Sequence, residues 1–141
     1  MRKRISLKEA VKFHGHLGPY LVLGILAGEL ALKRLKLKKY FGLEVMVWGA
    51  SNRPKSCLID GLQLSTGATY GKGNIYKHNA SAVRINFKSK DAGRVLSIRF
   101  NKALVRDLDC LKTHADSEKF ARRLYAGRLK GFLSHILTTT Y

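Results

Sequence analysis

The first third of the chain contains two periodic apolar stretches separated by a break rich in glycine. Ser6 and Glu9 have the spacing of a capping box, which predicts a helix over residues 7–14. Glycines and Pro19 follow, and proline is favoured at the first position of a helix. A second helical stretch is therefore expected over residues 19–38, apolar on nearly all sides at first and amphipathic towards its end. Whether the two stretches form one kinked helix or two helices stays open.

Short strands and further helices are predicted in the rest of the chain. A strand is expected over residues 44–48, and alternating apolar and polar positions predict a hairpin over residues 83–100. Asn101 is placed to cap a helix. This order predicts a single α+β domain over residues 1–141, with helices packed on one mixed or antiparallel sheet and residues 101–141 as a helical tail. The other expected elements are a helix from about residue 54 to 66, a glycine-rich loop over residues 67–74 and a final helical stretch from about residue 117.

Composition indicates an ordinary folded domain and leaves the charge as the unusual feature. The chain has 141 residues, of which 45% are hydrophobic, so disordered, collagen-like and disulfide-scaffold proteins are excluded. Lys and Arg number 27 against 9 Asp and Glu, which gives a net charge of +18. Such an excess of positive charge makes nucleic acids, anionic cofactors and phosphates candidate partners.

Cysteine usage and the longest apolar run both predict a cytoplasmic protein that does not span a membrane. Cys57 and Cys110 are far apart and form no C-x-x-C pair, which is typical of free thiols in a reducing compartment. The longest uncharged apolar stretch, residues 17–28, ends at Glu29, whereas a spanning helix needs about 20 apolar residues. We therefore expect this stretch to form a buried core helix.

Two histidines and one cysteine are the candidates for metal chemistry. His14 and His16 flank Gly15 where the first helix is expected to break, and a non-helical glycine there lets both imidazoles converge on one ion. Cys57 and Asp60 lie on the first turn of the next predicted helix, where the helix dipole favours the thiolate. Thiolate is both a metal ligand and a nucleophile. Each feature also has a plainer interpretation, namely a partly exposed histidine pair at a helix end and a cysteine that only packs.

The glycine-rich segment over residues 67–74 is a third candidate. It is not a Walker A loop, because one residue is missing between its glycines and no Ser or Thr follows Lys72. The backbone N–H groups of such a turn, together with Lys72, can still hold an anion. Its glycines can equally serve only to adopt positive φ angles.

Three motifs in this order resemble a known family. They are FHGHLGPYLVLG over residues 13–24, CLIDGLQ over residues 57–63 and TGATYGKGN over residues 66–74. Together they resemble the FmdE family, whose members are similar to one subunit of formylmethanofuran dehydrogenase, over roughly residues 7–100. The resemblance implies an α+β fold similar to the catalytic domain of glyceraldehyde-3-phosphate dehydrogenase, usually in a dimer, with a metal ion held by His and Cys of these motifs.

The resemblance also implies which residues form the site. Zn²⁺ is borderline-soft and accepts nitrogen and sulfur ligands, so zinc is the first choice of ion and another divalent metal is the alternative. The implied residues are the metal ligands His14, His16 and Cys57, and the rim residues Asp60, Lys72 and Asn74, which would contact a cofactor or an anion.

Two positions depart from the family pattern. Ala68 and Gly18 stand where members commonly have cysteine, and the chain has no cysteine-rich zinc module after its helical tail. A closed zinc site takes four ligands, and three are visible here. We therefore expect the metal at weak or partial occupancy, or an anion held near Lys72 instead.

Three functions stay open, and one assembly is predicted. The first function is that of an FmdE-like protein, alone or as an accessory subunit of a formylmethanofuran dehydrogenase complex, which binds a metal ion or a small anion. The second is an enzyme with Cys57 as nucleophile and His14 or His16 as base, although nothing in the sequence identifies a substrate. The third is a basic protein that binds nucleic acid non-specifically. Gly24 and Gly28 form a smooth helix face, which predicts a homodimer, and the alternative is that this face packs against the sheet within the chain.

Overall fold

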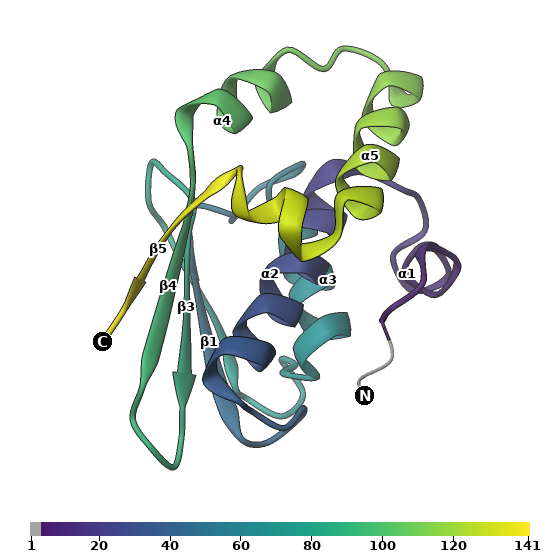
Figure 1. Cartoon of the computed structure of the whole chain (residues 1–141). Coiled ribbons are helices and arrows are strands. Elements are labelled where there is room, and N and C mark those ends of the chain that lie inside the picture. The colour runs from purple at the N-terminus through teal and green to yellow at the C-terminus, as the bar shows by residue number, and fades with distance from the viewer. Residues whose placement is uncertain (1–3) are drawn as a thin grey trace.

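The helices lie on one side of a single five-stranded sheet, as the computed structural model of residues 4–141 shows (Figure 1). In chain order the elements are α1 (Leu7–His14), α2 (Pro19–Leu35), β1 (Leu43–Trp48), α3 (Cys57–Thr66), β2 (Ile75–His78), β3 (Arg84–Ser89), β4 (Val95–Phe100), α4 (Lys102–Asp109), α5 (His114–Leu133) and β5 (Ile136–Thr140). The strands are ordered β2-β1-β3-β4-β5, with β1 and β2 parallel and every other neighbouring pair antiparallel. The predicted α+β fold with a mixed sheet is confirmed.

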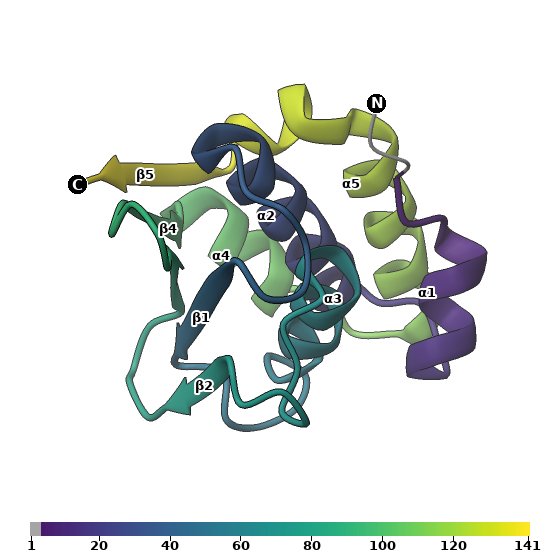
Figure 2. The same cartoon turned by 90° about the horizontal axis from the view of Figure 1, so that it is seen from below.

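The core lies between the sheet and the two helices α2 and α3. Figure 2 shows the sheet, then α2 and α3, then α1 and α5. Because strand side chains alternate between faces, Val45 and Val47 of β1 and Ile85 and Phe87 of β3 point towards the helices and are fully buried. The central helix α2 is buried along nearly its whole length, which explains why its sequence is apolar on almost all sides.

The break between α1 and α2 follows the predicted signals. The Ser6 hydroxyl accepts a hydrogen bond from the Glu9 backbone N–H (3.0 Å), and the Glu9 carboxylate accepts one from the Ser6 N–H (3.4 Å). Gly15 ends α1 with a φ of 109° and Pro19 begins α2, so the chain forms two helices bent by 120°. Among residues 4–141, no single helix is long and apolar enough to cross a membrane, and α1 and α2 meet that criterion only as this bent pair.

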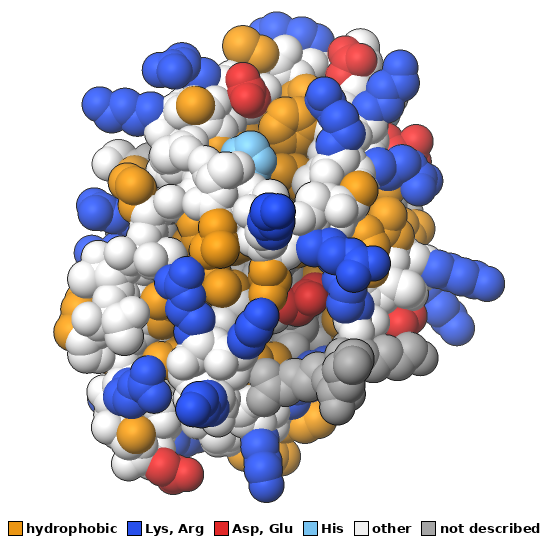
Figure 3. Space-filling model, in the orientation of Figure 1, with side chains coloured by type: hydrophobic (Ala, Val, Ile, Leu, Met, Phe, Trp, Pro, Cys, Tyr) orange, Lys and Arg blue, Asp and Glu red, His pale blue; other side chains and the backbone are white. Residues whose placement is uncertain are grey.

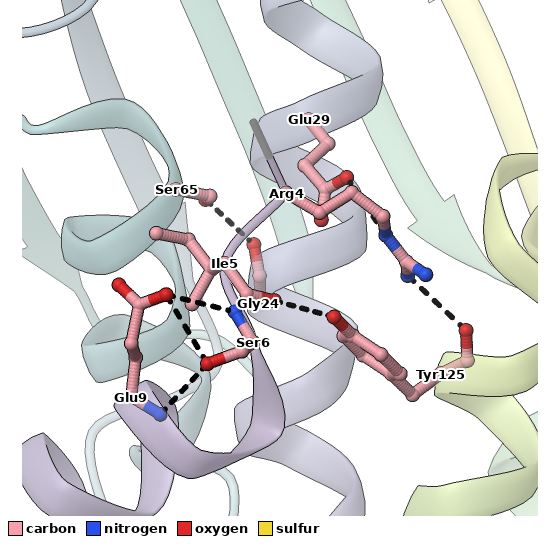
Figure 4. Close-up of polar contacts among 8 residues, drawn as sticks. All are labelled: Arg4, Ile5, Ser6, Glu9, Gly24, Glu29, Ser65 and Tyr125. Carbon is pink, nitrogen blue, oxygen red and sulfur yellow. Dashed lines mark hydrogen bonds and ion pairs between the residues drawn. The ribbon is translucent and has the colours of Figure 1, made fainter. Parts of the chain in front are cut away.

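The segment before α1 is fixed to α2 and α5 (Figure 4). Arg4 pairs with Glu29 (Nε to Oε2, 3.6 Å), donates to the Tyr125 carbonyl (3.1 Å) and lies over the Tyr125 ring, 3.9 Å from its centroid. The Tyr125 hydroxyl donates in turn to the Ile5 carbonyl (2.6 Å). These contacts fix the start of α1. Because a helix is rigid over two turns, they also help to fix the position of its last residue, His14.

The glycine face of α2, formed by Gly24 and Gly28, packs against α3 of the same chain. A Cβ on Gly24 would lie 2.2 Å from the Leu58 carbonyl oxygen, and a Cβ on Gly28 would lie 1.8 Å from the Ser65 hydroxyl oxygen. The Ser65 hydroxyl donates to the Gly24 carbonyl (3.2 Å; Figure 4). This face was expected at a dimer interface, but the backbones of α2 and α3 touch along it, so it is not available to a second copy.

The C-terminal stretch differs from the predicted helical tail. Asn101 caps α4 as predicted, and its side-chain oxygen accepts a hydrogen bond from the Leu104 N–H (2.9 Å). After α5, however, residues 136–140 form the strand β5, in which Ile136 lies opposite Phe100 of β4. Three successive threonines favour an extended backbone. The pairing itself is a long-range contact that the local pattern does not contain.

Candidate metal centre

The two histidines come together because α1 ends between them. His14 is the last residue of α1, and Gly15 adopts a left-handed conformation (φ 109°) that turns the chain before His16. The two imidazole centroids lie 4.8 Å apart with their planes at 58°. Residues two apart on a regular helix point to different faces, so this convergence depends on the glycine.

Cys57, the first residue of α3, completes a cluster with these histidines. One potential ligand atom each from His14, His16 and Cys57 lies within 4.8 Å of the other two. In tetrahedral zinc sites, bond lengths of roughly 2.0 and 2.3 Å place neighbouring ligand atoms about 3.3–3.5 Å apart. Small side-chain rotations would therefore bring the three atoms to bonding positions around one ion.

Asp60, one turn after Cys57 on α3, orients His14. The His14 Nδ1 lies 2.5 Å from the Asp60 Oδ2, and the His14 side chain is only 11% exposed. The other ring nitrogen, Nε2, is buried and has no hydrogen-bond partner among the described residues. Histidines that bind metal ions commonly donate one ring N–H to a carboxylate and use the other nitrogen as the ligand. The cluster residues therefore fit a metal ion.

The Cys57 thiol is not activated in the way that its position on α3 predicts. Burial raises the pKa of this thiol and the Asp60 carboxylate raises it further, while the Arg53 guanidinium offsets part of the effect. The Cys57 backbone N–H donates to the Pro54 carbonyl (3.1 Å), and its hydrogen bond to the thiolate lowers the pKa by less than burial raises it. The expectation that the start of the helix favours the thiolate was therefore wrong, because burial and the Asp60 carboxylate together outweigh the groups that lower this pKa.

A cavity of about 210 Å³, here called the cluster cavity, adjoins His16 and Cys57. It lies between the start of α2, the loop before α3 and the start of α5. No sequence signal linked His114 to the cluster, because the residue lies far along the chain and outside the three motifs. A larger cavity of about 690 Å³ near the end of α2 has no histidine or cysteine in its described lining. The polar lining of the cluster cavity consists of His16, Tyr20, Arg53, Cys57, His114 and Ser117.

Lys72 and Asn74, predicted from the sequence as rim residues, do not join this cluster. Both follow the C-terminal end of α3, and a helix of ten residues is on the order of 15 Å long. Asn74 is 2% exposed, accepts a hydrogen bond from the Thr69 N–H (3.0 Å) and donates to the Tyr40 carbonyl (2.6 Å). Lys72 Nζ lies 3.2 Å from the Thr69 hydroxyl and 5.7 Å from the Tyr40 ring centroid. The loop is thus held by its own polar contacts.

The two departures from the family pattern have different consequences here. Ala68 is fully buried in the core beyond the C-terminal end of α3, so a thiol at this position would not reach the cluster. A Cβ on Gly18, by contrast, would lie 3.4 Å from Cε1 and 3.7 Å from Nδ1 of His16. The absence of cysteine at position 18 therefore removes a neighbour of the cluster, whereas its absence at position 68 does not.

Two individual proteins are similar to this chain, one over about half of it and the other over nearly its whole length. A probable S-adenosyl-L-methionine-binding protein of Archaeoglobus fulgidus is 30% identical over 73 residues, which are 49% of this chain and 19% of that protein. The chain thus spans about a fifth of the length of this curated relative.

The crystal structure of a tungsten formylmethanofuran dehydrogenase FmdE-like protein from Syntrophus aciditrophicus matches with a TM-score of 0.64. The match covers 96% of this chain and 69% of that chain at 17% identity, so it shows the fold. The profile of the family described as FmdE, molybdenum formylmethanofuran dehydrogenase operon, matches residues 13–137, and the chain belongs to this family.

Proposed function

We propose that this chain is a metal-binding protein of the FmdE family, with His14 Nε2, an imidazole nitrogen of His16 and the Cys57 thiolate as ligands. The observation that carries the proposal is His14 Nε2, which is buried, lacks a partner among the described residues and belongs to a ring oriented by Asp60. A buried polar atom without a partner costs about 1–3 kcal/mol, and a metal ion would satisfy it. Zinc is the first choice because it accepts nitrogen and sulfur, and another divalent metal is the alternative.

Three protein ligands leave one coordination position for a further ligand. A zinc ion bound in this way would supply Lewis-acid chemistry to water or to a small molecule. His16 and Cys57 line the cluster cavity, so a molecule in that cavity would lie beside the ion. His16 is solvent-exposed, and an exposed site with three protein ligands supports weak or partial occupancy.

The observations favour Cys57 as a metal ligand over Cys57 as a free nucleophile. Burial and Asp60 raise the pKa of its thiol, which lowers the thiolate fraction at neutral pH. The Nδ1 of His14 is already hydrogen-bonded to Asp60, so this nitrogen is not available as a base for the thiol. A bound divalent ion would offset the effects of burial and of Asp60 on the thiol pKa, because metal binding releases the thiol proton.

Partners belong to the same proposal. The description of the family names the molybdenum formylmethanofuran dehydrogenase operon, and this supports association with a complex of that type. The homodimer rests on the family resemblance alone, because the glycine face of α2 packs against α3. Lys and Arg side chains are spread over the face shown in Figure 3, and the net charge is +18. This charge supports only non-specific contact with nucleic acid, which would weaken steeply as salt increases.

Cobalt substitution tests the metal proposal, because a cobalt–thiolate bond produces a characteristic near-ultraviolet absorption band. We expect the purified protein loaded with Co²⁺ to show this band and Zn²⁺ to displace the cobalt. Cys57→Ala removes a ligand, so it should abolish the band and weaken metal binding by more than the roughly 10–100-fold cost of changing an outer partner.

Cys110→Ala is the matched control, since Cys110 is an exposed thiol at the end of α4. It should leave the band and the metal content unchanged. A wild-type protein that binds no metal by elemental analysis, or a cobalt spectrum that Cys57→Ala does not alter, would overturn the proposal.

A further inference from the structure

The cluster cavity is lined by a cation and by hydrogen-bonding groups, and by no carboxylate of the described chain. Arg53 carries its permanent positive charge and lies close enough to Cys57 to lower the pKa of that thiol. His114 and His16 face the same space from α5 and from the break before α2. The lining therefore favours an anion over a cation or a neutral molecule.

The carboxylates on the surrounding elements do not line the cavity. Asp60 is hydrogen-bonded to His14, and Asp116 lies in the first turn of α5. Asp109, at the end of α4, acts on Tyr20 from a distance and adds to the burial that raises the pKa of Tyr20 to about 12. At neutral pH the Tyr20 hydroxyl is thus uncharged and does not repel an anion.

Two long helices begin at this cavity. The backbone N–H groups of Tyr20, at the start of α2, and of His114, at the start of α5, have no acceptor among residues 4–141. Such N–H groups and the positive ends of the helix dipoles bind anions. They add to the positive charge of Arg53 in the same lining.

We propose that the cluster cavity binds a small carboxylate, with its two oxygens on the Arg53 guanidinium and its short apolar part against Leu17, Pro19 and Pro54. A volume of about 210 Å³ equals roughly seven waters of about 30 Å³ each, which suits an acid of about four to six non-hydrogen atoms. A guanidinium matches the planar carboxylate better than any other side chain does. The inference rests on the proposed metal site only in that a bound ion adds a second positive charge.

Propionate is the probe, and propionamide is its uncharged counterpart of nearly the same shape. Saturation-transfer NMR and titration calorimetry measure binding to the zinc-loaded and to the metal-free protein. We expect propionate to bind both forms, the loaded form more tightly, and propionamide to bind neither measurably. Arg53→Ala should weaken propionate at least about tenfold, because a hydrogen-bonded charge pair is lost.

Lys55→Ala is the matched control, because Lys55 lies two residues from Arg53 and lines a neighbouring cavity but not the cluster cavity. It removes the same charge and should change propionate affinity less than twofold. Arg53→Lys should retain part of the affinity. Arg53 is exposed on a loop, and circular dichroism checks that each variant is folded.

The outcomes separate this inference from the metal proposal. If the protein binds no metal but the metal-free form binds propionate through Arg53, the carboxylate site stands and the metal centre fails. If metal binds and propionate does not, or if Arg53→Ala and Lys55→Ala behave alike, the carboxylate site is wrong. Tighter binding of inorganic phosphate than of propionate, with the same dependence on Arg53, would also overturn the assignment to carboxylates.

Discussion

The two ends of α3 look equally functional in the sequence and differ in the structure. The N-terminal end brings Cys57 and Asp60 to the two histidines, where His14 Nε2 has no partner among the described residues. The C-terminal end leads into the loop of Lys72 and Asn74, whose polar atoms are bonded to Tyr40, Leu43 and Thr69.

The difference lies in what each set of polar groups still needs. Buried polar groups are almost always paired, so a group without a partner calls for a ligand or another explanation. At the N-terminal end of α3 a metal ion would supply the missing partner. At the C-terminal end the loop supplies its own partners, so the structure gives its polar residues a role in holding the loop.

Asn74→Ala should have the largest effect and should confine it to stability. The change leaves the Tyr40 carbonyl and the Thr69 N–H without their partner, which should cost about 2–4 kcal/mol of unfolding free energy. Urea denaturation measures this loss, and Asn79→Ala, at an exposed asparagine, is the control. Cobalt affinity should stay unchanged in both variants. A large loss of metal affinity in Asn74→Ala at full folding would mean that the two ends of α3 act together.

Asp60→Asn should affect the other end of α3 and metal binding. The amide cannot hold the His14 ring with the strength of the carboxylate, so metal affinity should fall about 10–100-fold. The cobalt–thiolate band should persist, because Cys57 and both histidines remain. This combination distinguishes a positioning residue from a ligand, whose loss removes the band. Asp91→Asn, which changes the same charge in the hairpin turn, should have no effect on either quantity.

The dependence of stability on pH tests how Cys57 is held without metal. Folding raises the pKa of this thiol above its ordinary value of about 8.5. As pH rises, the unfolded chain therefore loses the thiol proton before the folded chain does. The folded state then binds more protons than the unfolded state, and stability should fall as pH rises. We expect this loss to begin near the ordinary thiol pKa of about 8.5, to be smaller than the two preceding effects, and to be absent from Cys57→Ala. A stability that rises over this range would mean that the helix end favours the thiolate after all.

Local signals predicted much of the fold. The Ser6–Glu9 capping box, the Asn101 cap and the break at Gly15 each depend on residues a few positions apart, and each is present. The strand β5 was missed because its pairing with β4 joins Ile136 to Phe100 across two helices. No local pattern records such a contact, and three threonines alone do not specify a strand.

The candidate site was predictable only where a local feature, such as a helix end or a glycine, determines how nearby side chains are placed. His14 and His16 could be paired from Gly15, and Cys57 could be placed at the start of a helix. The sequence could not show that Lys72 and Asn74 lie at the other end of that helix, because motif order along a chain does not give distance in space. His114 reaches the cluster cavity from α5 and carried no signal at all.

Lys72→Ala should have the smallest effect, and it compares directly with Arg53→Ala. Both variants remove one positive charge near an end of α3. The Lys72 ammonium is exposed and lies 5.6 Å from the Phe41 ring centroid and 3.2 Å from the Thr69 hydroxyl, so its loss should cost no more than about 0.5–1 kcal/mol of stability. Propionate and phosphate should bind Lys72→Ala as they bind the wild type, whereas Arg53→Ala should lose propionate. If calorimetry showed the reverse, the anion would be held by the glycine-rich loop, and the interpretation of the two ends of α3 would have to be exchanged.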